Sequence, residues 1–221
     1  MTVLERSLRR VLPLMALTAV LASCGLMYPE EVRNIISQQQ IRLLEESGLK
    51  VHSGLNPPDV EGSYRTTTLK ATFDSTNIYP SVYAYYYRFY DQDDDRNSVR
   101  IDYNGGNGGD VANGEGAFLS GNGSRFSLFV EAEGVTNGIP YRQVSVYSGT
   151  ITEQGIKDFQ LGIILVEKDG DDNDVLLMPV EGRRVFVEED GLAERVVWPY
   201  ASIRGAAADE GDGLSPILGG R

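Results

Sequence analysis

The chain has few of the residues that most often carry nucleophilic and metal chemistry. Its 221 residues include one histidine, His52, and one cysteine, Cys24. A histidine-rich metal site is therefore excluded, and any Ser-His-Asp or Cys-His arrangement would have to use His52, which we expect to be a solvated loop residue. A single cysteine also excludes an internal disulfide, so the fold must rest on its hydrophobic core. These absences predict a protein that is not an enzyme.

The chain also lacks a long hydrophobic run near its start. The uncharged stretch 11–22 holds 12 residues, whereas a helix that spans a bilayer needs about 20. Three arginines precede this stretch, and the small residues Ala22 and Ser23 follow its apolar core. That order is typical of a signal peptide with a cleavage site at its end.

The stretch closes with the run Leu21-Ala22-Ser23-Cys24. This run resembles the lipobox of bacterial lipoproteins, whose pattern is Leu-Ala/Ser-Gly/Ala/Ser-Cys. The resemblance implies cleavage between Ser23 and Cys24, a thioether-linked diacylglycerol on the Cys24 sulfur, and acylation of the new N-terminus by a chain such as palmitate. Two or three acyl chains anchor a protein stably, since each buried CH2 contributes about 0.8 kcal/mol. The alternatives are an uncleaved short anchor or a buried core thiol.

Gly25 follows the expected cleavage site. In lipoproteins of enteric bacteria an aspartate at this position is associated with retention in the inner membrane. The resemblance therefore implies a protein of the bacterial cell envelope, held by its lipid and located at the outer membrane. Whether the domain would face the periplasm or the outside stays open.

Positive charge is scarce in the expected mature protein. The whole chain has 20 basic and 32 acidic residues, of which the signal peptide holds three arginines and one glutamate. The remaining 198 residues therefore have 17 basic and 31 acidic side chains, a net charge of −14. Phosphate backbones repel such a surface, which makes nucleic acid an unsuitable partner. A chain of this length can bury one substantial core.

Residues 29–47 are predicted to form one amphipathic helix. Pro29 suits a first helical position, and Gly48 suits the position after the last turn. The apolar residues between them follow the 3.6-residue period and form one stripe, namely Val32, Ile35, Ile36, Leu43 and Leu44. We expect this stripe to pack on the protein's own domain, and the Pro-rich segment 54–62 to form a loop.

From residue 63 onward the sequence changes to strands rich in Ser, Thr, Tyr and Val, separated by turn clusters of Gly, Asn or Asp. Sequential strands joined by short turns predict a mainly β fold, an antiparallel up-and-down barrel of eight or nine strands, because closure leaves no exposed edges; a β-sandwich is the alternative. The predicted strands are 63–73, 82–91, 98–104, 110–120, 125–134, 141–152, 157–168, 174–180 and 184–189, with a short last segment at 194–198.

The expected organisation of the chain has four parts. A signal peptide covers 1–23, and a lipidated N-terminal part with the helix and the Pro-rich loop covers 24–62. The barrel domain covers 63–200. The last part, 201–221, is rich in Gly, Ala and acidic residues and is predicted to be a disordered tail.

The first predicted strand opens with Gly62-Ser63-Tyr64. The order of helix, loop, Gly-x-Tyr strand start and meander resembles the lipocalin-like (calycin) barrels, which usually have Gly-x-Trp at this point, so Tyr64 departs from their pattern. The resemblance is architectural and covers residues 62–190. A barrel of eight strands is either filled by its own side chains or just wide enough for one small ligand.

Aromatic side chains crowd the predicted strand 82–91. Alternation places one set on one face, namely Tyr83, Tyr85, Tyr87 and Phe89, and the second set on the other, namely Tyr86, Arg88 and Tyr90. The first set is the candidate ligand-binding set, because tyrosine both stacks and hydrogen bonds. The alternative interpretation is a filled core with cross-strand aromatic pairs.

Acidic residues cluster in one predicted turn. Asp169, Asp171 and Asn173 have the first, third and fifth positions of an EF-hand calcium loop. The sixth position is Asp174 rather than glycine and the twelfth is Val180 rather than glutamate, so the EF-hand pattern fails. A solvated hairpin turn is the main expectation, and a weak calcium site is the alternative.

Three functions remain open from the sequence. The first is a lipid-anchored, non-enzymatic lipoprotein whose barrel binds a small apolar ligand. The second is a structural or interaction lipoprotein with a filled barrel that docks onto another envelope protein. The third and least favoured is an envelope hydrolase, because one loop histidine cannot assemble a nucleophile-base pair. No cofactor is expected apart from the covalent diacylglycerol on Cys24.

Overall fold

The computed structural model describes residues 28–105, 111–136 and 138–199. The expected signal peptide, Cys24 and the expected C-terminal tail lie outside the described residues. Two helices open the described part of the chain, α1 (Glu30–Ile35) and α2 (Gln38–Glu46). The strands that follow are β1 (Leu55–Asn56), β2 (Gly62–Arg65), β3 (Thr68–Asp74), β4 (Ser81–Tyr83), β5 (Tyr85–Asp93), β6 (Ser98–Gly105), β7 (Val111–Asn122), β8 (Arg125–Thr136), β9 (Ile139–Thr152), β10 (Gly155–Lys168), β11 (Arg183–Glu188) and β12 (Leu192–Val196).

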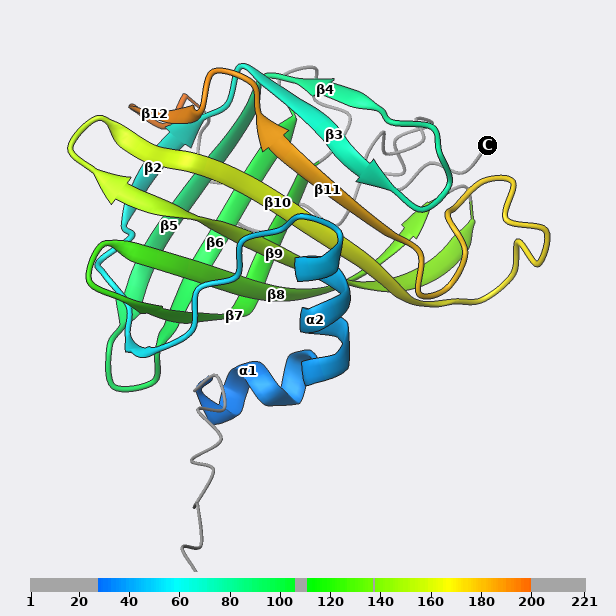
Figure 1. The fold of residues 1–221 in the computed structure, drawn as a ribbon, viewed down its shortest axis with the longest axis horizontal. Helices are drawn as coiled ribbons and strands as arrows, with labels where there is room; N and C mark the ends of the chain where they lie inside the picture. Colours follow the sequence, from blue (N-terminus) through cyan, green and yellow to red (C-terminus); the bar gives the residue numbers. More distant parts are fainter. Residues whose placement is uncertain (1–27, 106–110, 137, 200–221) are drawn as a thin grey trace, which may run out of the picture.

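The strands form a closed antiparallel barrel of eight strands (Figure 1). Three of the eight are interrupted once, so that β2 with β3, β4 with β5, and β11 with β12 each act as one bent strand. Each strand pairs with the next along the chain, and β11 and β12 return to pair with β3 and β2. The up-and-down barrel predicted from the sequence is confirmed, and the alternative of a β-sandwich is wrong.

Period-two alternation divides the side chains of the barrel between its interior and its outer face. In β8, Phe126 and Leu128 belong to the interior core, whereas Phe129 belongs to a second core on the outer face. In β9, Tyr147 points inward and Val146 points outward in the same way. Where the helices cover the barrel, both its inner and its outer face are therefore apolar. Elsewhere only the inner face is apolar.

The predicted single helix is two helices, and this expectation was wrong. The chain leaves the helical conformation at Ile36 and restarts at Ser37, whose hydroxyl accepts a hydrogen bond from the Gln40 amide, while the Gln40 side chain accepts one from the Ser37 amide. This capping box starts α2 independently of α1. The predicted apolar stripe still packs, since Val32, Ile36 and Leu44 are all buried on the barrel.

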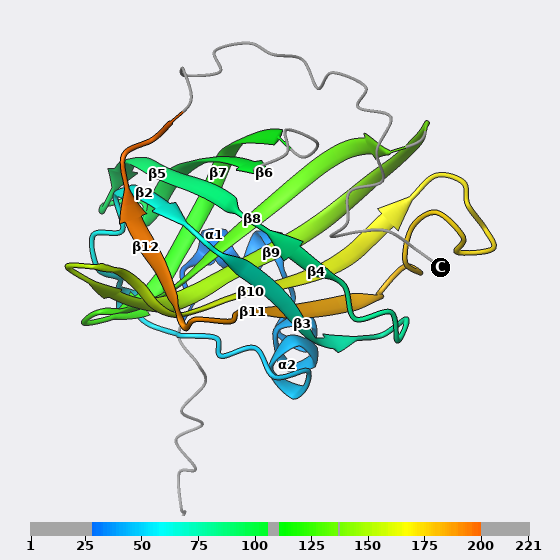
Figure 2. The ribbon, with the colours of Figure 1, turned by 90° about the horizontal axis from the view of Figure 1, so that it is seen from above.

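Both helices and the segment after them lie on the outer face of the barrel (Figures 1 and 2). The Lys50 amide donates to Gln160 of β10, and the His52 amide donates to the Ser127 hydroxyl of β8. The predicted Pro-rich loop contains β1, which pairs parallel with the end of β7. The N-terminal segment is thus fixed to the barrel by backbone hydrogen bonds as well as by its apolar stripe.

The predicted strand 174–180 is also wrong. Residues 169–182 form the loop between β10 and β11, and the Asp171 carboxylate organises it by accepting hydrogen bonds from the amides of Val175, Leu176 and Leu177. Such side-chain bonds to nearby amides compete with a strand ladder. The loop nevertheless buries Leu177 and Met178 against the interior core, which explains its apolar sequence.

Candidate functional site: the barrel interior and a surface groove

Three of the four predicted ligand-binding aromatics lie inside the barrel. Tyr85, Tyr87 and Phe89 are buried and belong to the interior core. The fourth, Tyr83, has 71% of its surface exposed, so its predicted place on the same face is wrong. The reason is Ala84, whose positive φ of 53° separates β4 from β5 and breaks the alternation between Tyr83 and Tyr85.

Aromatic rings fill the middle of the interior. The Tyr87 ring lies 5.4 Å from that of Tyr147 and 5.4 Å from that of Phe159, between ring centroids. Tyr85 stacks on Tyr87 at 6.0 Å, and Tyr147 lies 6.4 Å from Phe89. These separations are those of rings in direct contact. The middle of the barrel is therefore packed, as the filled-core interpretation expected.

The interior becomes more accessible toward one end of the barrel. We call this the open end; it carries the connections β3–β4, β8–β9 and β10–β11. Along β8, the inward residues change from fully buried Leu128 to partly exposed Ala132. Along β9 they change from Tyr147, 4% exposed, to partly exposed Tyr141, although the next inward residue, Ile139, is buried. Inward side chains that solvent reaches indicate where a ligand could enter.

The strands also separate at the open end. The ladder between β7 and β8 ends at the pair Phe118–Phe129, although β8 continues to Thr136. The earlier residues of β7 have a ladder only on their other side, with β6. Figure 2 shows the ends of β8 and β9 projecting away from β6 and β7. The described part of β8 beyond Phe129 thus has a ladder only with β9, which makes one side of the open end a strand edge.

Polar side chains replace apolar ones on the inner row of β9 near this end. Gln143 and Ser145 alternate with outward Val144 and Val146, so both face the interior. Gln143 is 6% exposed, and its Nε2 lies 3.5 Å from the Ser145 hydroxyl. Within the described residues, its Oε1 has no hydrogen-bond partner. A buried amide without its full set of partners costs free energy and needs an explanation.

A buried ion pair lies beside the same end. Arg184 of β11 and Asp74 of β3 stand opposite each other in the ladder, and the Arg184 Nε lies 2.9 Å from the Asp74 carboxylate. Both side chains are almost completely buried, and Thr76 donates two further hydrogen bonds to Asp74. Burial by itself raises the pKa of Asp74, but the Thr76 hydrogen bonds and the Arg184 charge outweigh it and hold that pKa below its usual value.

The second cation near this end, Lys168 of β10, is also paired. Its Nζ lies 2.7 Å from Asp174 and 3.1 Å from Asp171. Burial lowers the pKa of Lys168, but the hydrogen bonds to the two carboxylates outweigh it and raise that pKa. Lys168 therefore pairs with two carboxylates of the acidic turn in which the sequence suggested a calcium alternative at Asp169, Asp171 and Asn173.

The structure gives these three calcium candidates different roles. Asp171 is committed to Lys168 and to the loop amides, Asp169 is exposed and lines a groove described below, and Asn173 is exposed in the turn. Among the described residues, no group of three or more histidine, cysteine, aspartate or glutamate side chains is arranged to hold a metal ion. An ammonium group already occupies the place that a cation would take beside Asp171.

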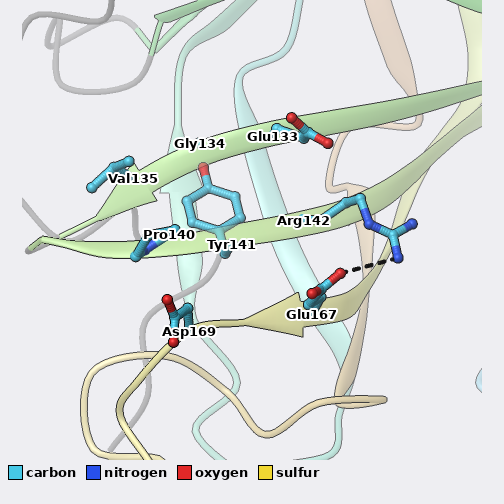
Figure 3. Close-up of a pocket in the computed structure, with 8 residues that line it drawn as sticks. All are labelled: Glu133, Gly134, Val135, Pro140, Tyr141, Arg142, Glu167 and Asp169. Atoms are coloured by element: carbon cyan, nitrogen blue, oxygen red, sulfur yellow. Dashed lines mark hydrogen bonds and ion pairs between the residues drawn. The ribbon is translucent and has the colours of Figure 1, made fainter.

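A shallow groove of about 460 Å³ lies on the projecting ends of β8, β9 and β10 (Figure 3). The Tyr141 ring covers Gly134, where a Cβ atom would lie 2.7 Å from the ring. Val135, which is 63% exposed, adds an apolar edge. The lining residues are Glu133, Gly134, Val135, Pro140, Tyr141, Arg142, Glu167 and Asp169.

The groove is acidic despite its arginine. Arg142 lies 2.6 Å from Glu131 and 3.4 Å from Glu167, so two carboxylates share its charge. Glu133 and Asp169 add two further negative charges to the lining. An acidic groove with a tyrosine and an exposed valine suits a cationic or neutral surface better than an anionic one.

The single histidine is partly buried rather than solvated, so that expectation was wrong. The backbone of His52 is fixed to the barrel, since its amide donates to Ser127 and its carbonyl accepts from the Ser120 hydroxyl. Burial, and then the positive charges of Arg125 and Lys50, lower the pKa of His52. These contacts give His52 a structural role in attaching the N-terminal segment to β7 and β8.

Sequence reasoning missed Gln143 and Ser145 as site residues. The signal was present, because the predicted strand 141–152 alternates and places Gln143 in the same row as Tyr147. A glutamine in an otherwise apolar row marks a buried polar position only when the inner face of the strand is known. The predicted barrel alone did not say which row of β9 faced inward.

Comparisons with known proteins give no family for the chain. No protein-family model, no curated protein and no solved structure matches it. Among the described helices, neither α1 nor α2 has the length and apolarity needed to cross a membrane. The functional interpretation therefore rests on the residues and their geometry.

Proposed function

We propose that this protein is a lipid-anchored, non-enzymatic lipoprotein of a bacterial cell envelope whose barrel binds a small, mainly apolar ligand at its open end. The observation that carries the binding part is the gradient of burial along β8 and β9. Inward residues are sealed in the middle of the barrel, and Tyr141 and Ala132 near the open end are partly exposed, although Ile139 at the start of β9 is buried. The aromatic stack would form the floor of such a site, and tyrosines its walls.

The anchoring part of the proposal rests on Leu21-Ala22-Ser23-Cys24. Replacing Cys24 by serine removes the thiol that would carry the diacylglycerol, so we expect the protein to lose incorporation of an alkyne-tagged palmitate in a bacterial host. We also expect it to leave the membrane fraction. The distant variant Ser124→Ala should keep both properties, and membrane retention of Cys24→Ser without label would contradict lipid anchoring.

Native mass spectrometry tests the binding part directly. The chain 25–221, purified gently from a bacterial host, should carry an additional mass that solvent extraction removes. That mass should also be regained when the extracted protein is offered the isolated compound. A bare protein that takes up neither host lipids nor a neutral hydrophobic dye would exclude a ligand-binding interior.

The surface groove favours a second candidate function, docking onto another envelope protein. Its acidic lining and exposed Val135 suit a partner surface with basic and apolar side chains. A photo-crosslinking residue at position 135 should then give one defined adduct in cells, and Glu133→Lys should abolish it. The same crosslinker at Lys157, an exposed position of β10 near the other end, is the control. Equal labelling from both positions would show random contact.

A further inference from the structure

We infer that the ligand of the open end is an uncharged molecule with a hydroxyl group on an apolar body, and that the Gln143 side chain binds this hydroxyl. The inference rests on the proposed binding function and specifies its chemistry. It excludes free fatty acids, which are anionic near neutral pH, as the preferred ligands. Two observations support it. The buried Gln143 amide lacks a full set of hydrogen-bond partners, and the cations Arg184 and Lys168 are already paired with carboxylates.

Gln143 is the polar group that a ligand would satisfy. Its side chain is more than nine-tenths buried and faces the interior between Ala132 of β8 and Leu165 of β10, its neighbours in the two ladders. The contact with Ser145 uses one of its two polar atoms. Whichever way the amide is turned, its other polar atom lacks a partner among the described residues. A hydroxyl group can both donate and accept, so it complements either orientation.

The charges near the open end argue against an anionic ligand. Arg184 is bound by Asp74 and Thr76, and Lys168 is bound by Asp171 and Asp174. Neither cation is left to receive a ligand carboxylate. Burying a carboxylate without a partner charge is costly, because its hydration is lost and little replaces it.

The buried carboxylate of Glu188 also argues against an anionic ligand. Glu188 of β11 is 1% exposed and accepts hydrogen bonds from the Thr67 and Thr68 amides. It lies in the inward row of β11 with Phe186 of the interior core. It lies four residues beyond Arg184, toward the other end of the barrel, so it adds a buried acidic side chain rather than a cation to the interior.

The approach to Gln143 follows from the separated strands. Ala132 pairs with Gln143 in the β8–β9 ladder and is partly exposed, although it faces inward. It lies in the part of β8 that has passed the end of its ladder with β7 at Phe129. We therefore expect a ligand to reach the Gln143 amide from the side of Ala132, a small and partly exposed residue at a strand edge.

Three probes of similar size test the chemistry: 1-hexanol, hexanoate at pH 8 and 1-chlorohexane. Binding is measured by saturation-transfer NMR on the full lipidated protein in nanodiscs, with empty nanodiscs as the blank. We expect hexanol to bind at least about ten times more tightly than hexanoate. The reason is the cost of burying the hexanoate carboxylate without a partner charge. A site built to hydrogen-bond a hydroxyl group should also discriminate against chlorohexane, which lacks it.

The decisive variant is Gln143→Leu, which keeps the volume and removes the amide. We expect it to weaken hexanol binding about five- to tenfold and to leave chlorohexane binding unchanged or tighter. Gln154→Leu, in the β9–β10 turn at the other end of the barrel, is the matched control and should change neither. Circular dichroism and melting temperature confirm folding, and loss of a partly unsatisfied buried amide should not lower the melting temperature.

The outcomes separate this inference from the function on which it rests. If hexanoate binds as well as hexanol, or Gln143→Leu weakens hexanol and chlorohexane equally, the chemistry assigned to Gln143 is wrong while the binding function stands. If none of the three probes binds the wild-type protein above the empty-nanodisc blank, the proposed binding function is overturned as well.

Discussion

The buried pair of Arg184 and Asp74 links β11 to β3 near the open end of the barrel. Asp74→Asn would leave the guanidinium buried with a neutral partner, and removing one member of a buried pair typically costs about 3–5 kcal/mol. We expect the free energy of unfolding in urea to fall by an amount in this range. Replacing both residues, as Asp74→Leu with Arg184→Met, should cost less than Asp74→Asn. A double variant that is the less stable of the two would show that the pair is itself strongly stabilising.

Asp171 makes stability depend on pH in the acid range. Burial alone raises its pKa, but hydrogen bonds from the Leu177 and Leu176 amides and from Lys168 outweigh it and lower the pKa to about 2. A carboxyl whose folded pKa lies below its unfolded value of 3.8 stabilises the fold above about pH 4. That contribution is lost as the pH falls from about 4 toward 2.

Asp171→Asn is expected to remove this dependence. The variant should unfold at lower urea concentration than the wild type at pH 7, because it loses charge-assisted bonds to the loop amides and to Lys168. The difference between the two proteins should shrink steadily as the pH is lowered below 4. Asp172→Asn, a neighbouring exposed position, is the control. A constant difference from pH 7 to pH 2.5 would contradict the assignment to Asp171.

At the scale of elements, the helical segment shows what periodicity can and cannot predict. The predicted stripe gave the burial of Val32, Ile36 and Leu44 correctly, because burial depends on which residues share a face. Ile35 and Leu43 are only partly buried, and buried Ile41 was missed. The break at Ile36–Ser37 was missed, since the stripe continues through it. The capping-box pattern Ser37-x-x-Gln40 that starts α2 is visible in the sequence. The apolar period continues through it without a break, however, and so favoured one helix over two.

The capping box should contribute measurably to the attachment of α2. Ser37→Ala removes the hydroxyl that accepts from the Gln40 amide, and loss of such a cap costs about 0.5–2 kcal/mol. We expect a lower melting temperature and faster amide hydrogen exchange in α2, with little change in the barrel strands. Ser124→Ala, at an exposed turn, should alter neither. Equal acceleration in α2 and in β8 would instead indicate that helix and barrel open as one unit.

At the scale of the whole molecule, the sequence predicted the topology better than the details of the interior. The explicit turn at Gly123 between β7 and β8, and the regular spacing of the strands, were sufficient to predict an up-and-down barrel. Tyr83 and the segment 174–180 were misplaced, because a positive φ at Ala84 and the side-chain bonds of Asp171 act locally and override alternation. The polar inner row at Gln143 could not be assigned before the inward face of β9 was known.

The last strand can close the barrel on β2 and β3 only if its ladder with β10 holds it in place. Gly155, with a φ of 146°, pairs with Glu194 of β12, and a Cβ atom at residue 155 would collide with the Ala193 carbonyl oxygen. The collision involves backbone, so it can be relieved only by moving the strands apart. Gly155→Ala is therefore expected to weaken the ladder between β10 and β12, which we call the seam and which holds the eighth strand in place for its closing ladders with β2 and β3.

Gly123→Ala is the matched control for this effect. Gly123 also has a positive φ, of 66°, but a Cβ atom there would have nothing within 4 Å. The φ of Gly123 lies in the left-handed helical region that other residues can adopt, whereas the φ of Gly155 lies in a region used almost only by glycine. The difference between the variants therefore reports the collision together with the added backbone strain at residue 155. We expect Gly155→Ala to be the less stable of the two in urea, with faster hydrogen exchange in β12 and in its partner β2. Because the ladder runs around the whole barrel, an opening confined to this seam would expose one new strand edge on each side and favour association of the variant at high concentration. Equal stability and exchange in the two variants would mean that the barrel tolerates a shifted seam, and that closure relies on the interior core rather than on the β10–β12 ladder.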